Sequence, residues 1–542
     1  MTFVRLLFRE DGPRVRRFFR IAAVSGISST YAFYLVATAS RNPADLLDSD
    51  GAFWTVLQFV VAVLVYCVSQ HRGLVLGGLI IEERVHALRT RLLATLQAAE
   101  LRDVETVGMA RITGALVNDT QALSQAAAPI AFAGQALAMS AIAAVYLTLV
   151  SPLAMLLTAA TTLVTGWVYL AHTRVVTEAL LTARARASEM QQQVVALVSG
   201  FKELKLSRDK ADEARATAVD ASQGSIRHML VAQRALSRDF VMSYLASLVL
   251  IGIVVFVMPW SGVTGGQSVS ASLSAVIWLL SPLWVMLGAI PQTKLADVSI
   301  GTLLDLQREL ESAVTVGRAE TELSPATPLS QNFREIQLRG AAFRYAKQSG
   351  AFSVGPLHLS VRRGELLFVT GDNGAGKSTI FKILAGLYRP SAGTLLIDDE
   401  DVWPDRVGEY RALVSAVFSD FHLFDRLYGI RNLDPAWSRE WLERLGIADK
   451  VSLQQGRFST LALSTGQRKR LALFVALAER RPILLLDEWA ADQDPSFRRR
   501  FYEELLPRLR AEGRTIVAIT HDDAYFHIAD RCVQVRAGMT PE

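Results

Sequence analysis

The sequence predicts a two-part fold, in which an all-α membrane domain of six spanning helices is followed by a C-terminal α/β domain. Two charge-free runs predict the first part, because no Asp, Glu, Lys or Arg occurs within residues 120–173 or 240–293. An apolar segment that leads into the glycine-rich loop 371–379 and then a helical segment predicts the second part. A soluble globular, disordered or disulfide-stapled protein has no use for two such runs.

The composition limits the kinds of partner. The chain has 542 residues, of which 51% are apolar and 20% charged, and its net charge is +5. Its two cysteines, Cys67 and Cys532, lie far apart in sequence, so no disulfide framework is expected. The excess of basic residues indicates membrane topology rather than a nucleic-acid surface. We therefore expect membrane lipid, and no nucleic acid, among the partners.

Six membrane spans are expected in order along the first part of the chain. A bilayer core needs about 20 apolar helical residues per span, so each charge-free run holds two spans. The first run breaks at Ser151-Pro152, and the second at the turn-rich stretch 261–266. Two shorter charge-free segments precede them. The expected spans lie near residues 21–39, 51–70, 128–149, 153–171, 241–259 and 271–290.

The distribution of basic residues predicts that both termini are cytoplasmic. Six Lys or Arg precede the first span, six lie within 71–119 and eleven within 174–239, whereas the alternate connections carry one, none and none. This positive-inside pattern is typical of a multi-pass protein of the bacterial cytoplasmic (inner) membrane. A cleaved signal peptide ending at Ala37-Thr38-Ala39 is the alternative for the first segment. Its 19-residue apolar core is longer than a signal needs, and another span follows at once.

The two long inner loops are expected to form helices that extend the spans into the cytoplasm. Residues 84–101 have apolar positions at helical spacing, and residues 174–239 contain two glycines and no proline. These helices are either simple charged stalks or levers that touch a second domain. As levers, their tips around 93–105 and 205–213 are expected to dock beside the aromatic pair Phe421 and Phe424.

The composition changes after the sixth span. Residues 316–331 are polar and include Pro325 and Pro328, which is typical of a linker. The chain beyond them has an ordinary soluble composition and is long enough for one well-cored α/β domain. The expected division is a six-span domain at 1–312, a linker at 313–331 and the α/β domain at 332–542.

The glycine-rich loop predicts a phosphate site. Residues 371–378 read G-x-x-x-x-G-K-S between a segment of strand character and a helical segment, which is the context that this motif requires. Glycines let backbone N–H groups converge on phosphate oxygens at a helix N-terminus. We expect Lys377 to reach the β- and γ-phosphates and the Ser378 hydroxyl to bind Mg²⁺. The expected nucleotide contacts are Gly371, Asn373, Gly374, Gly376, Lys377, Ser378 and Thr379.

A second apolar strand, at 483–486, ends in two acids, Asp487 and Glu488. Adjacent carboxylates at a buried strand tip are costly unless a cation or a proton transfer needs them. Asp487 suits the Mg²⁺ shell, and Glu488 suits the polarisation of an attacking water. The alternative, an ordinary strand that ends in surface acids, fails once the phosphate loop is present.

Together these motifs resemble the nucleotide-binding domain of ABC transporters. Residues 463–467 read LSTGQ and are similar to the family's signature motif. The resemblance places Ser464, Gly466 and Gln467 at the nucleotide, with Ser464 and Gly466 on a γ-phosphate held by the opposite subunit. It further implies three assignments, namely Tyr345 on the adenine, Asp494 in the D-loop, and His521 as the switch histidine and second catalytic residue.

One position departs from the family's pattern. The Q-loop normally supplies a Gln that contacts Mg²⁺ and water, and the matching stretch 416–424 has Ser419 at that place. Serine is shorter and is expected to reach the metal through a water, unless Asp420 substitutes for it. The expected metal-site residues are thus Ser378, Asp487 and Ser419.

The resemblance covers essentially the whole chain, whose six spans and single nucleotide domain have the order of an exporter-type half-transporter. A composite site needs the signature of a second chain, which implies a homodimer or a heterodimer, with ATP and Mg²⁺ as cofactors. The stretches 200–206, 418–424 and 487–495 resemble exporters of cyclic peptides and siderophores, of the pyoverdine and syringomycin type. The implied activity is ATP-driven export of an amphipathic, peptide-like secondary metabolite (cyclic peptide, lipopeptide or siderophore precursor) by alternating access.

Other functions share parts of this pattern. A broad drug or lipid exporter has the same ATPase domain. A nucleotide-gated regulator hydrolyses ATP without pumping, but the intact signature and Glu488 speak against it. An importer usually carries its permease and its ATPase on separate chains. An ion-coupled transporter is disfavoured because the charge-free runs contain no acid or base.

Overall fold

The computed structural model describes residues 12–41, 49–258, 266–314, 332–345, 353–536 and 539. The chain forms two compact units. One comprises Met1–Ala94 and Met109–Arg308, and the other comprises Thr95–Gly108 and Glu309–Glu542. The predicted turn at 261–265 and nearly all of the predicted linker lie outside the described residues.

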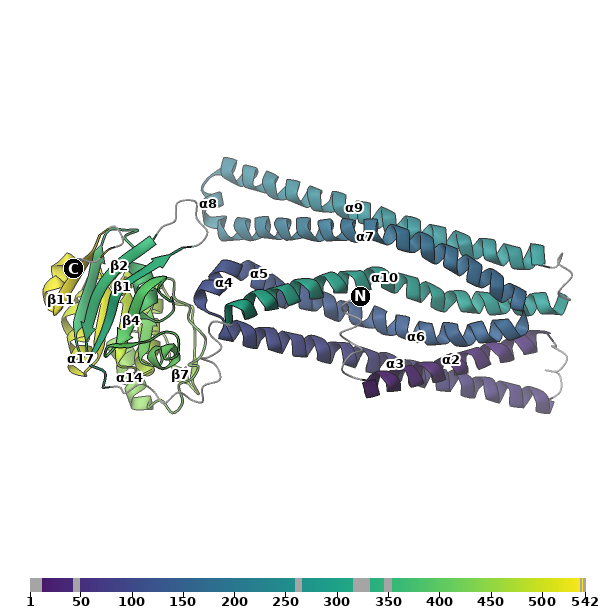
Figure 1. Ribbon diagram of the computed structural model, residues 1–542, viewed down its shortest axis with the longest axis horizontal. Helices are drawn as coiled ribbons and strands as arrows, with labels where there is room; N and C mark the ends of the chain where they lie inside the picture. The colour runs from purple at the N-terminus through teal and green to yellow at the C-terminus, as the bar shows by residue number, and fades with distance from the viewer. Residues whose placement is uncertain are drawn as a thin grey trace. The chain divides into compact units, whose positions relative to one another are not determined.

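The first unit is built from long helices (Figure 1). Two π-helical turns, η2 (Ala115–Asp119) and η3 (Ile253–Val257), lead into or continue them. The helices are α2 (Gly12–Arg41), α3 (Ser49–Ala98), α5 (Met109–Gly114), α6 (Thr120–Val150), α7 (Pro152–Ser199), α8 (Phe201–Lys205), α9 (Arg208–Gly252) and α10 (Gly266–Val314).

Six helical segments among the described residues are long and apolar enough to cross a membrane, as predicted. Most of them run well past the predicted apolar cores, because the charged turns beyond those cores remain helical, whereas Pro152–Ala171 nearly coincides with the predicted 153–171. The long inner loops are accordingly helical, with α7 and α9 meeting at the short α8. The candidate spans are Gly12–Ala39, Ala52–Ala98, Met109–Val150, Pro152–Ala171, Arg208–Val257 and Ala271–Glu311.

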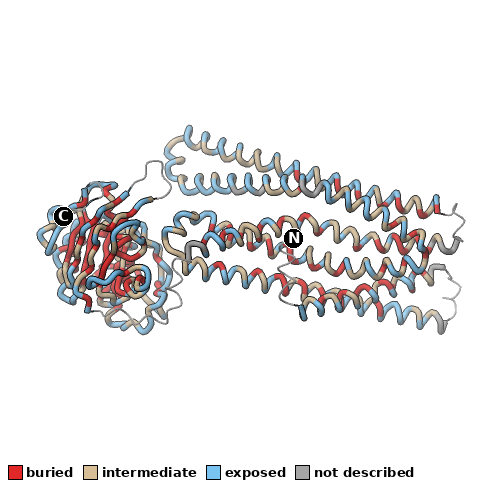
Figure 2. The backbone as a smooth tube through the Cα atoms, in the orientation of Figure 1, coloured by how far each residue is buried: buried red, intermediate tan, exposed pale blue. Residues whose placement is uncertain are grey.

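Close packing inside the helical unit pairs α2 with α6 and α7 with α9. At Gly26 of α2, an added Cβ would lie 2.6 Å from the Cδ1 of Ile142 on α6, so glycine permits this approach. The outer faces of this unit contain many exposed residues (Figure 2). Large apolar side chains, such as those of Leu149, Leu163 and Phe256, are among the exposed ones. Such faces suit lipid or a second chain rather than water.

The second unit contains two main sheets. The antiparallel sheet has the order β2-β1-β4-β5, and the parallel sheet has the order β11-β3-β10-β9-β6. The antiparallel strands are β1 (Glu335–Arg344), β2 (Ser353–Arg362), β4 (Ala392–Ile397) and β5 (Glu400–Asp401). The parallel strands are β3 (Leu366–Gly371), β6 (Val414–Val417), β9 (Ile483–Asp487), β10 (Thr515–Ile519) and β11 (Arg531–Val535).

Helices and short elements complete this unit. They are α4 (Leu101–Val107), α12 (Lys377–Leu384), α13 (Val407–Arg411), α14 (Pro435–Arg444), α15 (Thr465–Ala478), α16 (Pro495–Arg500) and α17 (Leu506–Ala511), the turns η5 (Trp489–Asp492), η6 (Phe501–Leu505) and η7 (Asp523–Ile528), and the hairpin β7 (Leu453–Gln454) with β8 (Arg457–Phe458).

The parallel sheet is buried on both faces. Within β3, Leu367 and Val369 face one hydrophobic core, whereas Leu366 and Phe368 face another. This explains why its strands are continuous apolar runs. The pairing register aligns Val369, Ile519 and Asp487 across β3, β10 and β9. The loops that follow these three strands therefore leave the same edge of the sheet.

Candidate nucleotide site

The edge of the parallel sheet brings together the predicted catalytic residues. The phosphate loop follows β3, Glu488 follows β9, and His521 lies just beyond β10. The Glu488 carboxylate Oε1 lies 3.4 Å from His521 Nε2. Both side chains are partly exposed, so a nucleotide and a water can reach them.

The phosphate loop has the geometry that its glycines predict. Gly374 and Gly376 have φ of 82° and 90°, and Gly376 caps the N-terminus of α12. At Gly376 a side chain would also collide with Val354, because an added Cβ would lie 2.6 Å from its Cγ2. The buried amine of Lys377 donates to the carbonyl oxygens of Gly371 and Asp372, at 2.8 and 3.0 Å. Asn373 and Ser378 are exposed at the surface of the loop.

Asp487 is held by the residue that departs from the family's pattern. The Ser419 hydroxyl donates to Asp487 Oδ2 at 3.2 Å. Burial raises the pKa of Asp487, and the hydrogen bond from Ser419 opposes that rise. The other carboxylate oxygen, Oδ1, is buried without a hydrogen-bond partner among the described residues.

These residues fit a magnesium ion. A buried carboxylate oxygen without a donor is costly, and a divalent cation satisfies it. Ser378, whose hydroxyl also interacts with Asp487, is the second group that fits such an ion. Ser419 binds Asp487 directly and so fits a supporting position behind the metal ligand better than the water-mediated metal contact expected of it.

Hydrogen bonds to its backbone hold Glu488 in position. The residue adopts a left-handed conformation, with φ of 48° and ψ of 38°. Its N–H donates to the Ile519 carbonyl at 3.2 Å, and its own carbonyl accepts a 2.8 Å hydrogen bond from the buried amine of Lys469. The same amine lies 2.7 Å from Asp492 Oδ2. Lys469 therefore joins α15, the predicted catalytic residue Glu488 and the D-loop segment 491–494.

The signature forms the first turn of α15. Ser464 caps this helix, with its hydroxyl accepting from the Gln467 N–H at 3.4 Å while Gln467 Oε1 accepts from the Ser464 N–H at 3.1 Å. The Gln467 side chain is thus engaged in capping the helix. Gly466 packs against the D-loop, since an added Cβ there would lie 2.8 Å from the Asp492 carbonyl oxygen. Ser464 itself is exposed.

Asp494 caps the next helix. Its carboxylate accepts from the Phe497 N–H at 2.9 Å at the start of α16, and it pairs with Arg470 at 2.7 Å. Hydrogen bonds from Ser496 and from the Phe497 N–H lower the pKa of Asp494 to about 2. The carboxylate therefore orders the D-loop within its own chain.

Tyr345, the residue expected on adenine, directly follows β1. Its hydroxyl is 2.8 Å from the Thr379 hydroxyl, and its ring meets Phe343 and Tyr388 edge-on, with centroids 5.0 and 6.2 Å apart. Thr379 is buried on α12, beside the loop rather than at its surface. Tyr345 is therefore tied to the first turn of the phosphate-loop helix.

Helix α4, at the tip of the first inner loop, packs against the nucleotide domain within the second unit. Glu105 pairs with Lys382 at 2.9 Å and accepts a hydrogen bond from Tyr388, and Glu100 pairs with Arg411 at 2.6 Å. Burial, together with the hydrogen bond to Glu105, raises the pKa of Tyr388. The prediction that this tip docks beside Phe421 and Phe424 is therefore wrong in its partner, since the contact lies along α12 and α13.

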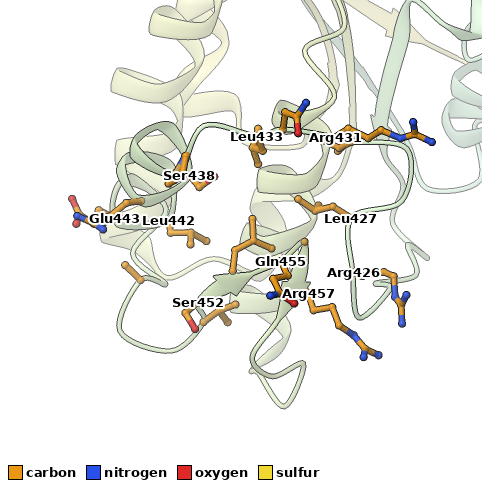
Figure 3. A pocket seen from close by; sticks show the side chains of 18 residues that line it. Arg426, Leu427, Arg431, Leu433, Ser438, Leu442, Glu443, Ser452, Gln455 and Arg457 are labelled. Carbon is orange, nitrogen blue, oxygen red and sulfur yellow. The ribbon is translucent and has the colours of Figure 1, made fainter.

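A hollow in this domain lies away from these residues (Figure 3). Its volume is about 920 Å³, and residues 426–457 line it, including Arg426, Arg431, Arg439 and Arg457. None of the predicted nucleotide-site residues lines this hollow. It is therefore no candidate for the nucleotide site.

One residue that positions the site, Lys469, was missed by the sequence reasoning. Lys469 lies two residues after the signature, but its burial, which marks its role, appears only in the structure. The role of Ser419 was left open because its hydrogen bond to Asp487 joins residues far apart in the chain. The contacts of Lys469 and Ser419 both depend on how β6, β9 and α15 pack together.

Comparison with known proteins identifies the class. Residues 354–491 match the model of the ABC transporter family. The uncharacterized ABC transporter ATP-binding protein YvrO of Bacillus subtilis is 32% identical over 199 residues, which are 34% of this chain and 84% of that protein. The chain therefore belongs to the ABC transporter family, and its C-terminal domain is a nucleotide-binding ABC domain.

Among individual relatives, the ATP-binding protein SyrD of Pseudomonas syringae pv. syringae is 39% identical over 355 residues. The alignment covers 63% of this chain and 62% of SyrD, so the chain spans less than two thirds of that relative. A solved structure of a bacterial Atm1-family ABC exporter with ATP bound superposes with a TM-score of 0.74 at 18% identity, covering 98% of this chain and 95% of that one.

These matches confirm the predicted fold class. The chain has the fold of an ABC exporter, in which six spanning helices precede one α/β nucleotide-binding domain. It is a multi-pass membrane protein with the domain order of an exporter-type half-transporter.

Proposed function

We propose that the protein is an ATP-driven exporter of the bacterial cytoplasmic membrane that moves an amphipathic, peptide-like secondary metabolite out of the cell by alternating access. The observation that carries this proposal is the meeting of Lys377, Asp487 and Glu488 at one edge of the parallel sheet, in a chain with six candidate spans. A phosphate-binding loop beside two carboxylates serves phosphoryl transfer, and the spans provide the route across the bilayer.

The working form is a dimer, and a homodimer is the simplest. The first turn of α15 exposes Ser464 and the helix N-terminus, where N–H groups and the helix dipole favour an anion. Each ATP would be clamped between the phosphate loop of one chain and the signature of the other. Both termini, and with them the nucleotide domain, lie on the cytoplasmic side in this proposal, following the positive-inside distribution of Lys and Arg.

Within each composite site the chain's own residues have distinct tasks. Lys377 leaves the loop carbonyls to bind the β- and γ-phosphates, and the Glu488 carboxylate orients the attacking water and accepts its proton. His521 holds the Glu488 carboxylate. Bound Mg²⁺ supplies the positive charge that neutralises the phosphate oxygens, and Ser378 and Asp487 hold it while Ser419 orients Asp487. Tyr345, tied to Thr379, borders the base.

Closure of the nucleotide domains is passed to the spans by the inner loops. The paired glutamates of α4 support a lever on the same chain. The α8 tip exposes Phe201, and Leu206 directly after α8 is also exposed. The nucleotide domain exposes the aromatic side chains of Phe424 and Tyr428. We propose that the α8 tip docks on these aromatics of the partner chain, which buries apolar surface on both sides.

The substrate class rests on the subfamily marks in the sequence and on the alignment with SyrD. A broad drug or lipid exporter is the second candidate, because its ATPase would be the same. Inverted vesicles separate the two. Concentrative, ATP-dependent uptake of a lipopeptide or siderophore precursor that typical drugs do not inhibit supports the first, and general uptake of hydrophobic dyes supports the second. Hydrolysis without any uptake would indicate a nucleotide-gated regulator.

The Glu488→Gln substitution tests the ATPase. It removes the base and keeps the shape of the side chain, so we expect ATP to bind with unchanged affinity while hydrolysis falls at least about a hundredfold. Phosphate release and binding of a fluorescent ATP analogue measure the two properties on purified protein. Glu503→Gln, which changes an exposed glutamate of the same domain, serves as the control and should hydrolyse normally. Near-wild-type hydrolysis by Glu488→Gln would contradict the catalytic assignment.

A further inference from the structure

Two adjoining hollows lie within the helical unit, between α7, α9 and α10. The larger has a volume of about 240 Å³ and an apolar wall that includes Leu250 and Trp284, interrupted by serine and threonine side chains. The smaller, of about 130 Å³, is lined by Tyr169 and Asp239. Thr165, Ser243 and Ala246 line both hollows, so the two are continuous along one wall.

Asp239 is the charged group of this site. The residue is 6% exposed and lies directly before the charge-free run of α9. Its nearest ion-pair partner is the adjacent Arg238, whose Nε is 3.9 Å away and whose side chain is 56% exposed. Among the described residues no hydrogen bond reaches the Asp239 carboxylate. A buried carboxylate at the end of a membrane span is costly unless a cation meets it.

Three of the hydroxyl groups that line the larger hollow present acceptors rather than donors. Ser243 donates to the Asp239 carbonyl at 2.8 Å, and Ser247 donates to the Ser243 carbonyl at 3.1 Å. Thr161 likewise donates to the Leu157 carbonyl at 2.8 Å. Because these protons are used within the helices, the oxygens offer lone pairs to an occupant. They favour a ligand that brings its own N–H donors.

The aromatic wall favours the same kind of ligand. Trp284 lines the larger hollow and packs against Phe240 and Tyr244, with ring centroids 5.3 and 6.2 Å apart. Aromatic faces attract cations, and their area also accommodates an apolar chain.

We infer that this paired hollow binds amphipathic cations, with a basic group at Asp239 and the attached apolar chain between α7, α9 and α10. The inference rests on the proposed function, because it names the chemical class of the exported molecule. The volume suits an amine-bearing arm of a larger molecule rather than a whole peptide. Neutral and anionic amphiphiles would leave the Asp239 carboxylate with the exposed Arg238 as its ion-pair partner among the described residues.

Direct binding with a matched set of probes tests this inference. The full-length protein in nanodiscs of zwitterionic lipid is incubated with tritiated dodecylamine, and 1-dodecanol and dodecanoate compete for the site. Binding beyond that of empty nanodiscs should saturate, and dodecylamine should compete at least about tenfold better than either other probe. Equal competition by the amine and the alcohol would overturn the inference.

Two variants locate the site. Asp239→Asn keeps the shape and removes the charge, so the preference for dodecylamine over dodecanol should vanish, whereas Asp220→Asn on the exposed part of α9 should leave it intact. Thr165→Leu narrows the junction of the two hollows and should weaken the binding of amine and alcohol alike, which tests the location independently. A preference that survives Asp239→Asn, or binding that is unaffected by Thr165→Leu, contradicts the proposal.

The same preparation separates the two proposals. If the wild-type protein neither hydrolyses ATP nor supports vesicle uptake but still binds the amine, the proposed exporter function is refuted and the cation site is not. Normal hydrolysis and uptake without any preference for the amine would refute the cation site alone.

Discussion

Lys469 is a positioning residue for Glu488. Its buried amine holds the Glu488 carbonyl and the Asp492 carboxylate, at 2.8 and 2.7 Å, and so keeps the left-handed backbone of Glu488 in place. We predict that Lys469→Met lowers kcat for ATP hydrolysis about tenfold or more, because the carboxylate shifts relative to the attacking water. The affinity for ATP should stay unchanged, since Lys469 does not face the phosphate loop. Steady-state kinetics and nucleotide titration measure both.

A matched variant distinguishes this effect from a general loss of charge. Arg499→Met removes a cation from the exposed face of α16 and should leave kcat unaltered. Equal loss of nucleotide affinity and of kcat in Lys469→Met would indicate misfolding instead, and the positioning role would then be wrong.

Ser419 is predicted to act on the metal through Asp487. Removing its hydroxyl in Ser419→Ala leaves Asp487 Oδ2 without its 3.2 Å donor. Loss of such a supporting hydrogen bond typically costs about tenfold in metal affinity or more. We therefore expect the Mg²⁺ concentration for half-maximal hydrolysis to rise about tenfold, with normal hydrolysis at saturating Mg²⁺.

The conservative change provides the control for this prediction. Ser419→Thr keeps the hydroxyl and should respond to Mg²⁺ like the wild type, whereas Ser452→Ala removes an exposed hydroxyl of the same domain and should change nothing. An unaltered Mg²⁺ response in Ser419→Ala would show that Asp487 is oriented by other groups.

At the residue scale, sequence predicts the groups whose chemistry lies in one short string. The phosphate loop and the acids after β9 belong to such strings, and the sheet register brings them to one edge. The bonds from Ser419 and Lys469 join segments that are distant in sequence, and they depend on packing that no local pattern encodes. Asp239 was not predicted as a site residue for another reason, since it lies one residue outside the charge-free run that defined the span.

At the element scale, α4 is predicted to be held on the nucleotide domain by two ion pairs. Glu100 with Arg411 and Glu105 with Lys382 are partly exposed, so each contributes about 0.5–1 kcal/mol. In the double variant Glu100→Ala/Glu105→Ala we expect amide hydrogen exchange in α4 to accelerate about tenfold. ATP hydrolysis should persist while its coupling to uptake weakens.

Charge reversal checks that the ion pair itself matters. Glu105→Lys alone should accelerate exchange in α4, and adding Lys382→Glu should restore it. Without this restoration, the effect of the double variant would come from lost packing or from the hydrogen bond with Tyr388.

The periodicity of the first inner loop predicted its helices correctly, because apolar spacing is a local property. The periodicity gave no information about which residues α4, at the tip of this loop, contacts. The expected partners, Phe421 and Phe424, are aromatic, but α4 presents Glu100 and Glu105. Their carboxylates instead bind Lys382 on α12, Tyr388 beyond the end of α12, and Arg411 on α13.

At the scale of the whole molecule, the chain combines a part whose surface suits lipid with a part whose surface suits water, and both parts present surfaces that suit a partner chain. Its helical unit keeps large apolar side chains exposed, and its nucleotide domain buries a parallel sheet on both faces. In the nucleotide domain, the signature at the start of α15 is exposed and could contact the phosphate of a nucleotide held by a second chain. The exposed apolar faces are costly in an isolated chain in water, and the exposed signature has no role there. Both surfaces have a function in the proposed membrane-embedded dimer.

The composite site makes a prediction that only a dimer can meet. Lys377→Ala disables the phosphate loop and Ser464→Arg obstructs the signature, so neither homodimer should hydrolyse ATP. A heteropair of the two, purified through separate tags, joins the intact loop of the Ser464→Arg chain to the intact signature of the Lys377→Ala chain. If the sites act independently, it should hydrolyse at about half the wild-type rate. A wild-type chain paired with the double variant contains no intact site and should be inactive. Activity in that control pair, or none in the heteropair, would mean that each ATP is hydrolysed within one chain.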